Sequence, residues 1–83
     1  MYEIVFTAVS KKQFLKLEKD IQKRILNGLE RIRIRPYSYV RKLVGDQGYK
    51  LRIGDYRIIT DIEKNKLIIL VLKVGHRKKI YKN

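Results

Sequence analysis

The chain has no cysteine and a single histidine, His76, among its 83 residues. Without cysteine neither a disulfide framework nor a thiolate metal site can form, and a multi-histidine metal site is excluded as well. Carboxylates are also scarce, with 8 Asp and Glu against 21 Lys and Arg. No two of them are spaced for a shared acid–base or Mg²⁺ site, and no glycine-rich loop precedes a helix. These absences argue against two-metal nuclease chemistry and a nucleotide cradle, so we expect no metal and no other cofactor.

Long hydrophobic runs are missing too. The longest, Leu67 to Leu72, is far too short to cross a bilayer, and the first residues lack a basic region followed by an apolar stretch. We therefore expect a cytoplasmic protein with no membrane association and no signal peptide.

A large positive charge is the strongest feature of the composition. The net charge is +13 at pH 7, while 45% of the residues are hydrophobic, which is ordinary for a folded chain. A small domain with this excess attracts polyanions. Nucleic acid is the first expected partner, an acidic protein the second and an anionic membrane the third, although a solvated lysine-rich surface would look similar. The length predicts one domain, residues 1–83.

The first half of the sequence predicts one strand and two helices. Residues 1–7 alternate loosely as a strand does. Ser10, followed by Gln13, fits a capping box and starts a short helix that runs to about Lys19. Asp20 is expected to cap a second helix, which Pro36 ends. Its apolar face consists of Ile21, Ile25, Leu29 and Ile32.

The second half predicts a loop and three strands. Residues 37–48 form the loop, 49–62 a hairpin turning at Gly54-Asp55, and 67–72 a central strand covered on both faces. The segment 75–83 is expected to cover part of one sheet face. We therefore predict a small α+β domain with the order β-α-α-β-β-β, an antiparallel sheet and a helical hairpin packed on one face.

The predicted hairpin gathers positive charge on one face. A two-residue turn sets Ile53 opposite Tyr56 and Arg52 opposite Arg57, with Lys50 on the arginine side. Two arginines across a ladder repel each other, so an anion between them is expected; the alternative is an ordinary solvent-facing strand. Arginine gives bidentate donors that match phosphate. Neighbouring guanidinium groups should also lower the pKa of Lys50 or Tyr81, which could then exchange protons near neutral pH.

The sequence resembles the RelE-type toxins of the RelE/ParE superfamily. The resemblance is carried by Arg41-Lys42-Leu43-Val44-Gly45, by residues 49–59 with their Gly54-Asp55-Tyr56-Arg57 turn, by residues 71–77 and by Tyr81. It implies the toxin of a type II toxin–antitoxin system, a metal-independent endoribonuclease that cleaves mRNA in the ribosomal A site by 2′-OH attack. It also implies a cognate acidic, RelB-like antitoxin, with the ribosome and mRNA as further partners.

The resemblance also implies the site residues. Lys50, Arg57, Arg77 and Tyr81 match functional positions of the family, whereas Arg52 stands where well-known members have a second lysine. His76 is either a further acid–base group or a strand-end histidine with local hydrogen bonds. Other cations are expected to hold ribosomal RNA, namely Lys11, Lys12, Lys23, Arg24, Arg31, Arg33, Lys78, Lys79 and Lys82.

Two other functions remain open. A ParE-like toxin would poison DNA gyrase without nuclease activity, and the set ending in Tyr81 argues for the nuclease branch. A non-enzymatic basic RNA-binding protein would place aromatic rings on the cationic face for base stacking. The hairpin puts Tyr49 and Tyr56 on the other face, which counts against this alternative.

Overall fold

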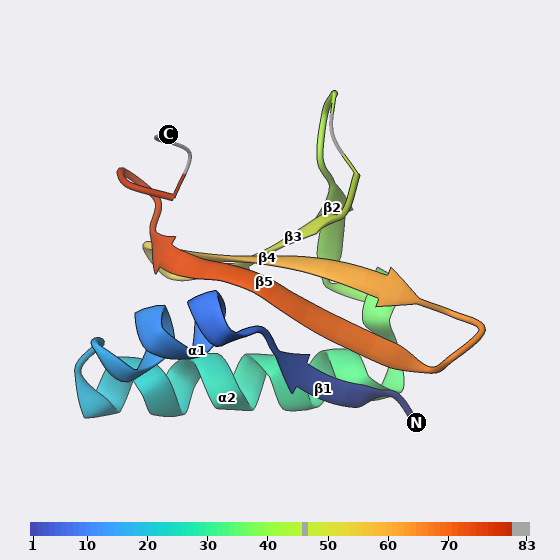
Figure 1. Ribbon diagram of the computed structural model, residues 1–83, viewed down its shortest axis with the longest axis horizontal. Coiled ribbons are helices and arrows are strands. Elements are labelled where there is room, and N and C mark those ends of the chain that lie inside the picture. Colours follow the sequence, from blue (N-terminus) through green and yellow to red (C-terminus); the bar gives the residue numbers. More distant parts are fainter. Residues whose placement is uncertain (46, 81–83) are drawn as a thin grey trace.

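The computed structural model describes residues 1–45 and 47–80, and it has the predicted α+β class with both helices on one side of a single sheet (Figure 1). The elements are β1 Glu3–Phe6, α1 Ala8–Leu15, α2 Lys19–Ile34, the 3-10 turn η1 Pro36–Ser38, β2 Val40–Lys42, β3 Tyr49–Ile53, β4 Tyr56–Glu63 and β5 Ile68–His76.

The sheet is mixed, with the order β1-β5-β4-β3-β2. Strands β2 to β5 pair antiparallel, but β1 runs parallel to β5, with Glu3 beside Ile68 and Phe6 beside Val71. The predicted antiparallel sheet is therefore wrong at β1, whose direction depends on how the helices return the chain. Strand β4 is central instead of β5. The predicted loop 37–48 also contains β2, which is too short to show an alternating pattern.

Helix α1 begins earlier than predicted. Thr7, not Ser10, is its N-cap, because Thr7 Oγ1 accepts a hydrogen bond from Ser10 N at 3.1 Å. Ser10 is fully buried, and its hydroxyl donates to the carbonyl of Val71 in β5 at 2.7 Å. The helix ends at Leu15 rather than Lys19. Gln22 closes the connection to α2 by donating from Nε2 to Leu17 O at 2.9 Å.

Helix α2 also departs from its predicted start. Glu18 is the N-cap, without a side-chain hydrogen bond, and Asp20 lies in the first turn, where its charge favours the helix dipole. The predicted apolar face is confirmed for Ile25, Leu29 and Ile32, each at most 1% exposed.

The predicted hairpin register is confirmed pair by pair. Ile53 lies opposite Tyr56 and Arg52 opposite Arg57, and Gly54 takes the positive φ of 56° that the tight turn requires. Leu51 and Ile58 are buried against the helices. A methyl group at Gly28 of α2 would collide with the side chain of Ile53, so this glycine allows the hairpin to pack close to the helix.

Other segments lie on the side of the sheet away from the helices. Residues 43–45 and 47–48, between β2 and β3, and residues 77–80 rise from that side (Figure 1). Ile80 is only 7% exposed and lies against Gly75, which agrees with the predicted cover for the residues up to 80. Tyr81, Lys82 and Asn83 lie outside the described residues. In the described part of the chain, no helix is long and apolar enough to cross a membrane.

Candidate functional site

Cations from three strands surround one hollow on the helix-free face of the sheet. The register sets Arg41 of β2 beside Lys50 of β3, and Arg52 of β3 beside Arg57 of β4. The hollow measures about 260 Å³, and we call it the cationic hollow. It is lined by Tyr39, Arg41, Lys50, Arg52 and Arg57. Three of the predicted site residues are thus brought together.

Arg57 is held in place by the turn of its own hairpin. Its Nη1 donates to the carbonyls of Gly54 and Tyr56, both at 2.9 Å. Because both bonds use Nη1, the Nε and Nη2 groups make no hydrogen bond within residues 1–45 and 47–80 and are open to a ligand. A half-buried guanidinium fixed in this way presents its donors in a set direction, as an oxyanion site requires.

The electrostatics of the cationic hollow favour an anion. Among residues 1–45 and 47–80, five line the hollow, of which four are cationic and none is acidic. Arginine remains charged at any physiological pH and fits phosphate with paired N–H donors. Arg41 and Arg52 are exposed, whereas Lys50 and Arg57 are half-buried, so a bound phosphate would lie between solvent and sheet.

Arg77 is not among the residues that line the cationic hollow. Its backbone N–H donates to Asp55 O at 2.8 Å, which continues the β4–β5 ladder past His76. Arg77 itself is the first residue of the turn that follows β5, so strand alternation does not set the face of its side chain. Its Nε lies 3.7 Å from Asp55 Oδ1, so an ion pair holds the side chain at the turn.

His76 belongs to the other side of the sheet. Its ring meets that of Tyr56, the residue opposite it in β4, at a centroid distance of 5.4 Å. Its Nδ1 accepts a hydrogen bond from Lys78 N at 3.2 Å. This placement separates His76 from the cationic hollow. The hydrogen bond to Lys78 N is of the local kind that the second interpretation of a strand-end histidine describes. Tyr81, the predicted proton-transfer partner of Lys50, falls outside the described residues.

Two residues of the cationic hollow were not expected from the sequence. Arg41 and Tyr39 fall in the predicted loop, and only the pairing of Val40 with Leu51 in β2 and β3 brings them to this face. The charged pattern of residues 41–42 was the available signal, but a three-residue strand gives no periodicity. Tyr39 also puts an aromatic ring, 51% exposed, on the cationic face. Tyr37 lies outside the hollow, and desolvation, with smaller effects from Tyr2 and Tyr49, raises its pKa.

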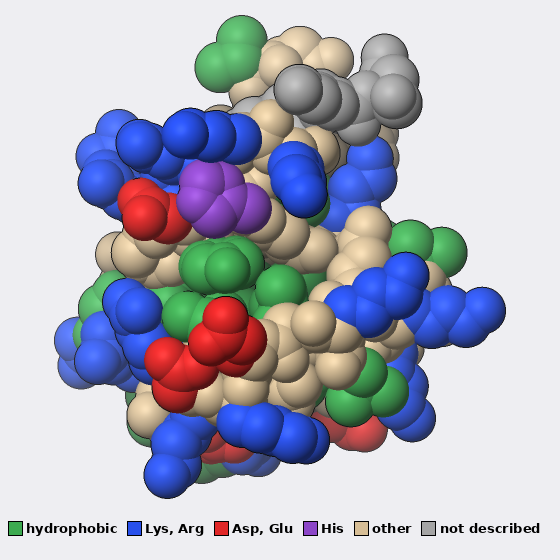
Figure 2. All heavy atoms as spheres, turned by 90° about the vertical axis from the view of Figure 1, so that its left-hand side faces the viewer, with side chains coloured by type: hydrophobic (Ala, Val, Ile, Leu, Met, Phe, Trp, Pro, Cys, Tyr) green, Lys and Arg blue, Asp and Glu red, His purple; other side chains and the backbone are tan. Residues whose placement is uncertain are grey.

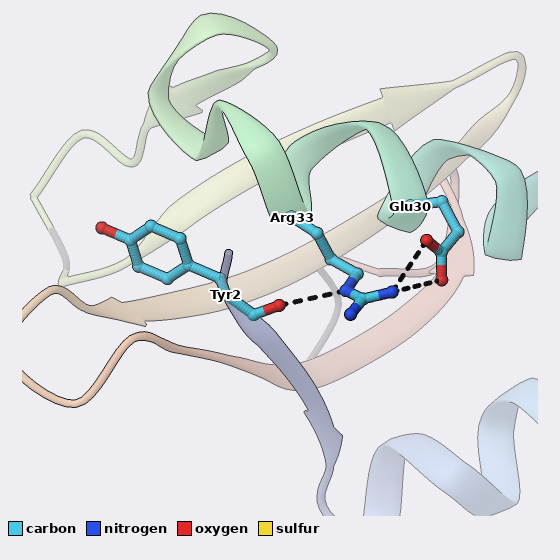
Figure 3. Close-up of polar contacts among 3 residues, drawn as sticks. All are labelled: Tyr2, Glu30 and Arg33. Atoms are coloured by element: carbon cyan, nitrogen blue, oxygen red, sulfur yellow. Dashed lines mark hydrogen bonds and ion pairs between the residues drawn. The ribbon is translucent and has the colours of Figure 1, made fainter.

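The predicted RNA-binding cations are spread over the helices and the C-terminal turn. Most of them are exposed, namely Lys11 and Lys12 on α1, Lys23, Arg24 and Arg31 on α2, and Lys78 and Lys79 after β5. Arg33 instead makes contacts within the protein (Figure 3). Its Nε donates to Tyr2 O at 3.0 Å, and its Nη1 forms an ion pair with Glu30 at 2.9 Å. Lys82 is not among the described residues.

The fold and the matches to known proteins define the class: a small toxin of the RelE/ParE superfamily. The sequence profile described as "ParE toxin of type II toxin-antitoxin system, parDE" matches residues 4–81. The chain belongs to this family, and the predicted resemblance to RelE-type toxins is confirmed. It is therefore the toxin of a type II toxin–antitoxin system. A search of the curated proteins gives no match.

Solved toxin–antitoxin complexes share the fold over almost the whole chain. The RelBE2 complex of Mycobacterium tuberculosis matches with a TM-score of 0.84 and 23% identity, covering 92% of this chain and 98% of that one. The intact RelBE complex of E. coli gives 0.77 and 25%, covering 92% and 96%. The archaeal RelE–RelB complex of Pyrococcus horikoshii gives 0.77 and 24%, covering 94% and 97%.

Proposed function

We propose that this toxin is a metal-independent endoribonuclease that enters the ribosomal A site, in the cytoplasm, and cleaves the mRNA there. The observation that carries the proposal is the cationic hollow, in which Arg41, Lys50, Arg52 and Arg57 gather around a space for one phosphate. Such a site can bind a phosphodiester and stabilise added negative charge on it. The similarity to RelE toxins supports the same reaction.

The reaction requires an attack within the RNA itself. The ribose 2′-oxygen attacks the adjacent phosphorus while the P–O5′ bond breaks, which leaves a 2′,3′-cyclic phosphate and a 5′-hydroxyl. Arg57 and Arg77 stabilise the phosphate charge in this proposal, and Arg52 assists them. A base takes the proton of the 2′-hydroxyl and an acid gives a proton to the 5′-oxygen; these roles fall to Lys50 and Tyr81. His76 lies on the other side of the sheet, which leaves it out of this scheme.

An acidic antitoxin is the proposed regulatory partner. The solved neighbours include RelB–RelE complexes, which supports a RelB-like protein in this role. The net charge of +13 would speed and orient the encounter with an acidic chain. The partner would neutralise the toxin by covering its cationic surfaces.

Cleavage of ribosome-bound mRNA by purified variants tests the site. We expect Arg57→Ala to lower the cleavage rate by roughly 10²–10³, the usual effect of losing one charge-stabilising donor, and Tyr81→Phe to lower it as well. Lys64→Ala, in the turn between β4 and β5, is the charge-matched control. If both site variants cut at the wild-type rate, the assignment of the site is wrong.

The ParE branch offers the second candidate function, because the matching profile is described as a ParE toxin. Such a toxin would poison DNA gyrase without cutting RNA. Mapping mRNA ends on ribosomes after induction separates the two: 5′-hydroxyl and cyclic-phosphate ends within the A-site codon support the nuclease. Loss of DNA supercoiling before translation stops, with intact mRNA, would establish the gyrase poison instead.

A further inference from the structure

A second hollow, of about 410 Å³, lies at the free edge of β5. Strand β1 pairs with β5 only as far as Val71, while β5 continues to His76. Beyond Val71 the hollow lies between α1 and the turn of residues 77–80, and we call it the edge hollow. It shares no lining residue with the cationic hollow.

The edge hollow is rich in hydrogen-bond donors. Three ammonium groups line it, those of Lys16, Lys73 and Lys79, together with Gln13 and His76, and no acidic side chain of the described residues is among its lining. Gln13 Oε1 already accepts the backbone N–H of Val74 at 2.8 Å, which leaves the amide NH₂ as its free group.

The histidine of the edge hollow is set to donate as well. Its Nδ1 accepts from Lys78 N at 3.2 Å, so a neutral imidazole carries its proton on Nε2. Asp55, an acidic side chain at this end of the molecule, is paired with Arg77. Figure 2 faces this end and shows the histidine side chain between an acidic side chain and cationic ones, above a patch of hydrophobic side chains that has further acidic side chains below it. A ligand here must bring acceptor oxygens.

The remaining lining is apolar. Leu17, Val74 and Ile80 contribute hydrophobic surface, and Tyr56 adds an aromatic ring. Donors around an apolar floor fit a ligand with an oxyanion attached to a flat, weakly polar body. Bare phosphate would use only the donors, whereas a nucleoside phosphate would use both parts.

We propose that the edge hollow is a second phosphate-binding site, which holds the phosphate of a nucleotide on its donors and the nucleoside on its apolar floor. The two hollows have lining residues at neighbouring positions of the β4–β5 pairing, because the pair Arg57–Gly75 is followed directly by the pair Tyr56–His76. Consecutive residues of a strand face opposite sides, so an RNA strand passing around the edge of β5 can reach both. The proposal that the nucleotide belongs to RNA rests on the proposed function. The proposal that the edge hollow binds a nucleotide does not depend on that function.

Nuclear magnetic resonance of the ring protons of His76 tests the site, since the chain has no other histidine. Titration of the full chain with adenosine 5′-monophosphate should move these signals in a saturable way. Replacing both Lys16 and Lys79 by glutamine should weaken binding by about tenfold, as the loss of two exposed ion pairs predicts. Lys64→Gln, at the far end of β5, is the control and should bind as the wild type does.

Several outcomes would overturn the site. The proposal fails if adenosine 5′-monophosphate at millimolar concentration causes no saturable shift of the His76 signals. It also fails if Lys64→Gln weakens binding as much as the double variant does. Loss of the response in Arg52→Ala would place the nucleotide in the cationic hollow. If inorganic phosphate binds as tightly as adenosine 5′-monophosphate, the apolar floor does not bind the nucleoside, and the proposal of a nucleotide site is wrong.

A short oligouridylate identifies the source of the nucleotide. Tighter binding of this RNA than of the mononucleotide supports an RNA strand at the edge hollow, and the reverse order supports a free nucleotide at the same site. These titrations use no ribosome. A toxin that binds nucleotide here but leaves mRNA intact would therefore overturn only the proposed function.

Discussion

At the scale of single residues, Arg52 is the feature that most constrains the chemistry. It lies opposite Arg57 in the cationic hollow, where the resemblance to RelE toxins leads one to expect a lysine. A guanidinium stabilises charge but does not release its proton at physiological pH, so it cannot act as the general acid. Proton transfer must then come from another group, and the contribution of Arg52 should be purely electrostatic.

This role predicts different effects for two substitutions. Arg52→Ala should lower the cleavage of ribosome-bound mRNA by roughly 10²-fold, because one charge facing the phosphate is lost. Arg52→Lys keeps the charge and should recover most of that loss in the same assay. A lysine variant as slow as the alanine variant would show that the paired donors of arginine are required, not the charge alone.

Gly48 and Gly45 give a matched pair of residues for backbone strain. Both have positive φ, 107° and 74°, but a methyl group at Gly48 would lie 2.8 Å from the carbonyl oxygen of Thr60, whereas one at Gly45 meets nothing within 4 Å. Gly48→Ala should therefore lower the free energy of unfolding by about 1–3 kcal/mol, and Gly45→Ala by less. Urea denaturation measures both; equal losses would mean that the carbonyl of Thr60 gives way.

At the scale of elements, predictions from the sequence succeeded where the signal was local. The Gly54-Asp55 turn fixes the register of β3 and β4, so it also places Arg52 opposite Arg57. The direction of β1 depends on long-range pairing with β5, about which the local pattern says nothing. Strand β2 exists only because β3 offers it an edge, which is why Tyr39 and Arg41 were absent from the predicted site.

The attachment of α1 to β5 leads to a prediction for this element. Ser10 is fully buried and donates to Val71 O at 2.7 Å. Ser10→Ala should lower the free energy of unfolding by about 1–2 kcal/mol, since a buried hydrogen bond is lost. Ser38→Ala in η1 is the exposed control and should change stability little. Thermal unfolding of both variants checks this; equal effects would show that the bond to β5 contributes nothing of its own.

At the scale of the whole molecule, the positive charge is distributed over both sides of the sheet. The cationic hollow lies on the side without helices, while Lys11, Lys12, Lys23 and other cations lie on α1 and α2. A single RNA strand in the hollow cannot meet all of these groups. The helical cations can hold RNA only where it surrounds the toxin, as in the proposed ribosomal A site.

The salt dependence of ribosome binding tests this arrangement. If Lys11 and Lys12 contact ribosomal RNA phosphates, replacing both by glutamine should reduce the magnitude of the slope of log affinity against log salt by about 1–2. The reason is that binding releases fewer counterions when these phosphate contacts are lost. Lys64→Gln, in the turn between β4 and β5, should leave the slope unchanged. An unchanged slope in the double variant would mean that α1 faces away from RNA, so the helical charge would serve another acidic partner instead.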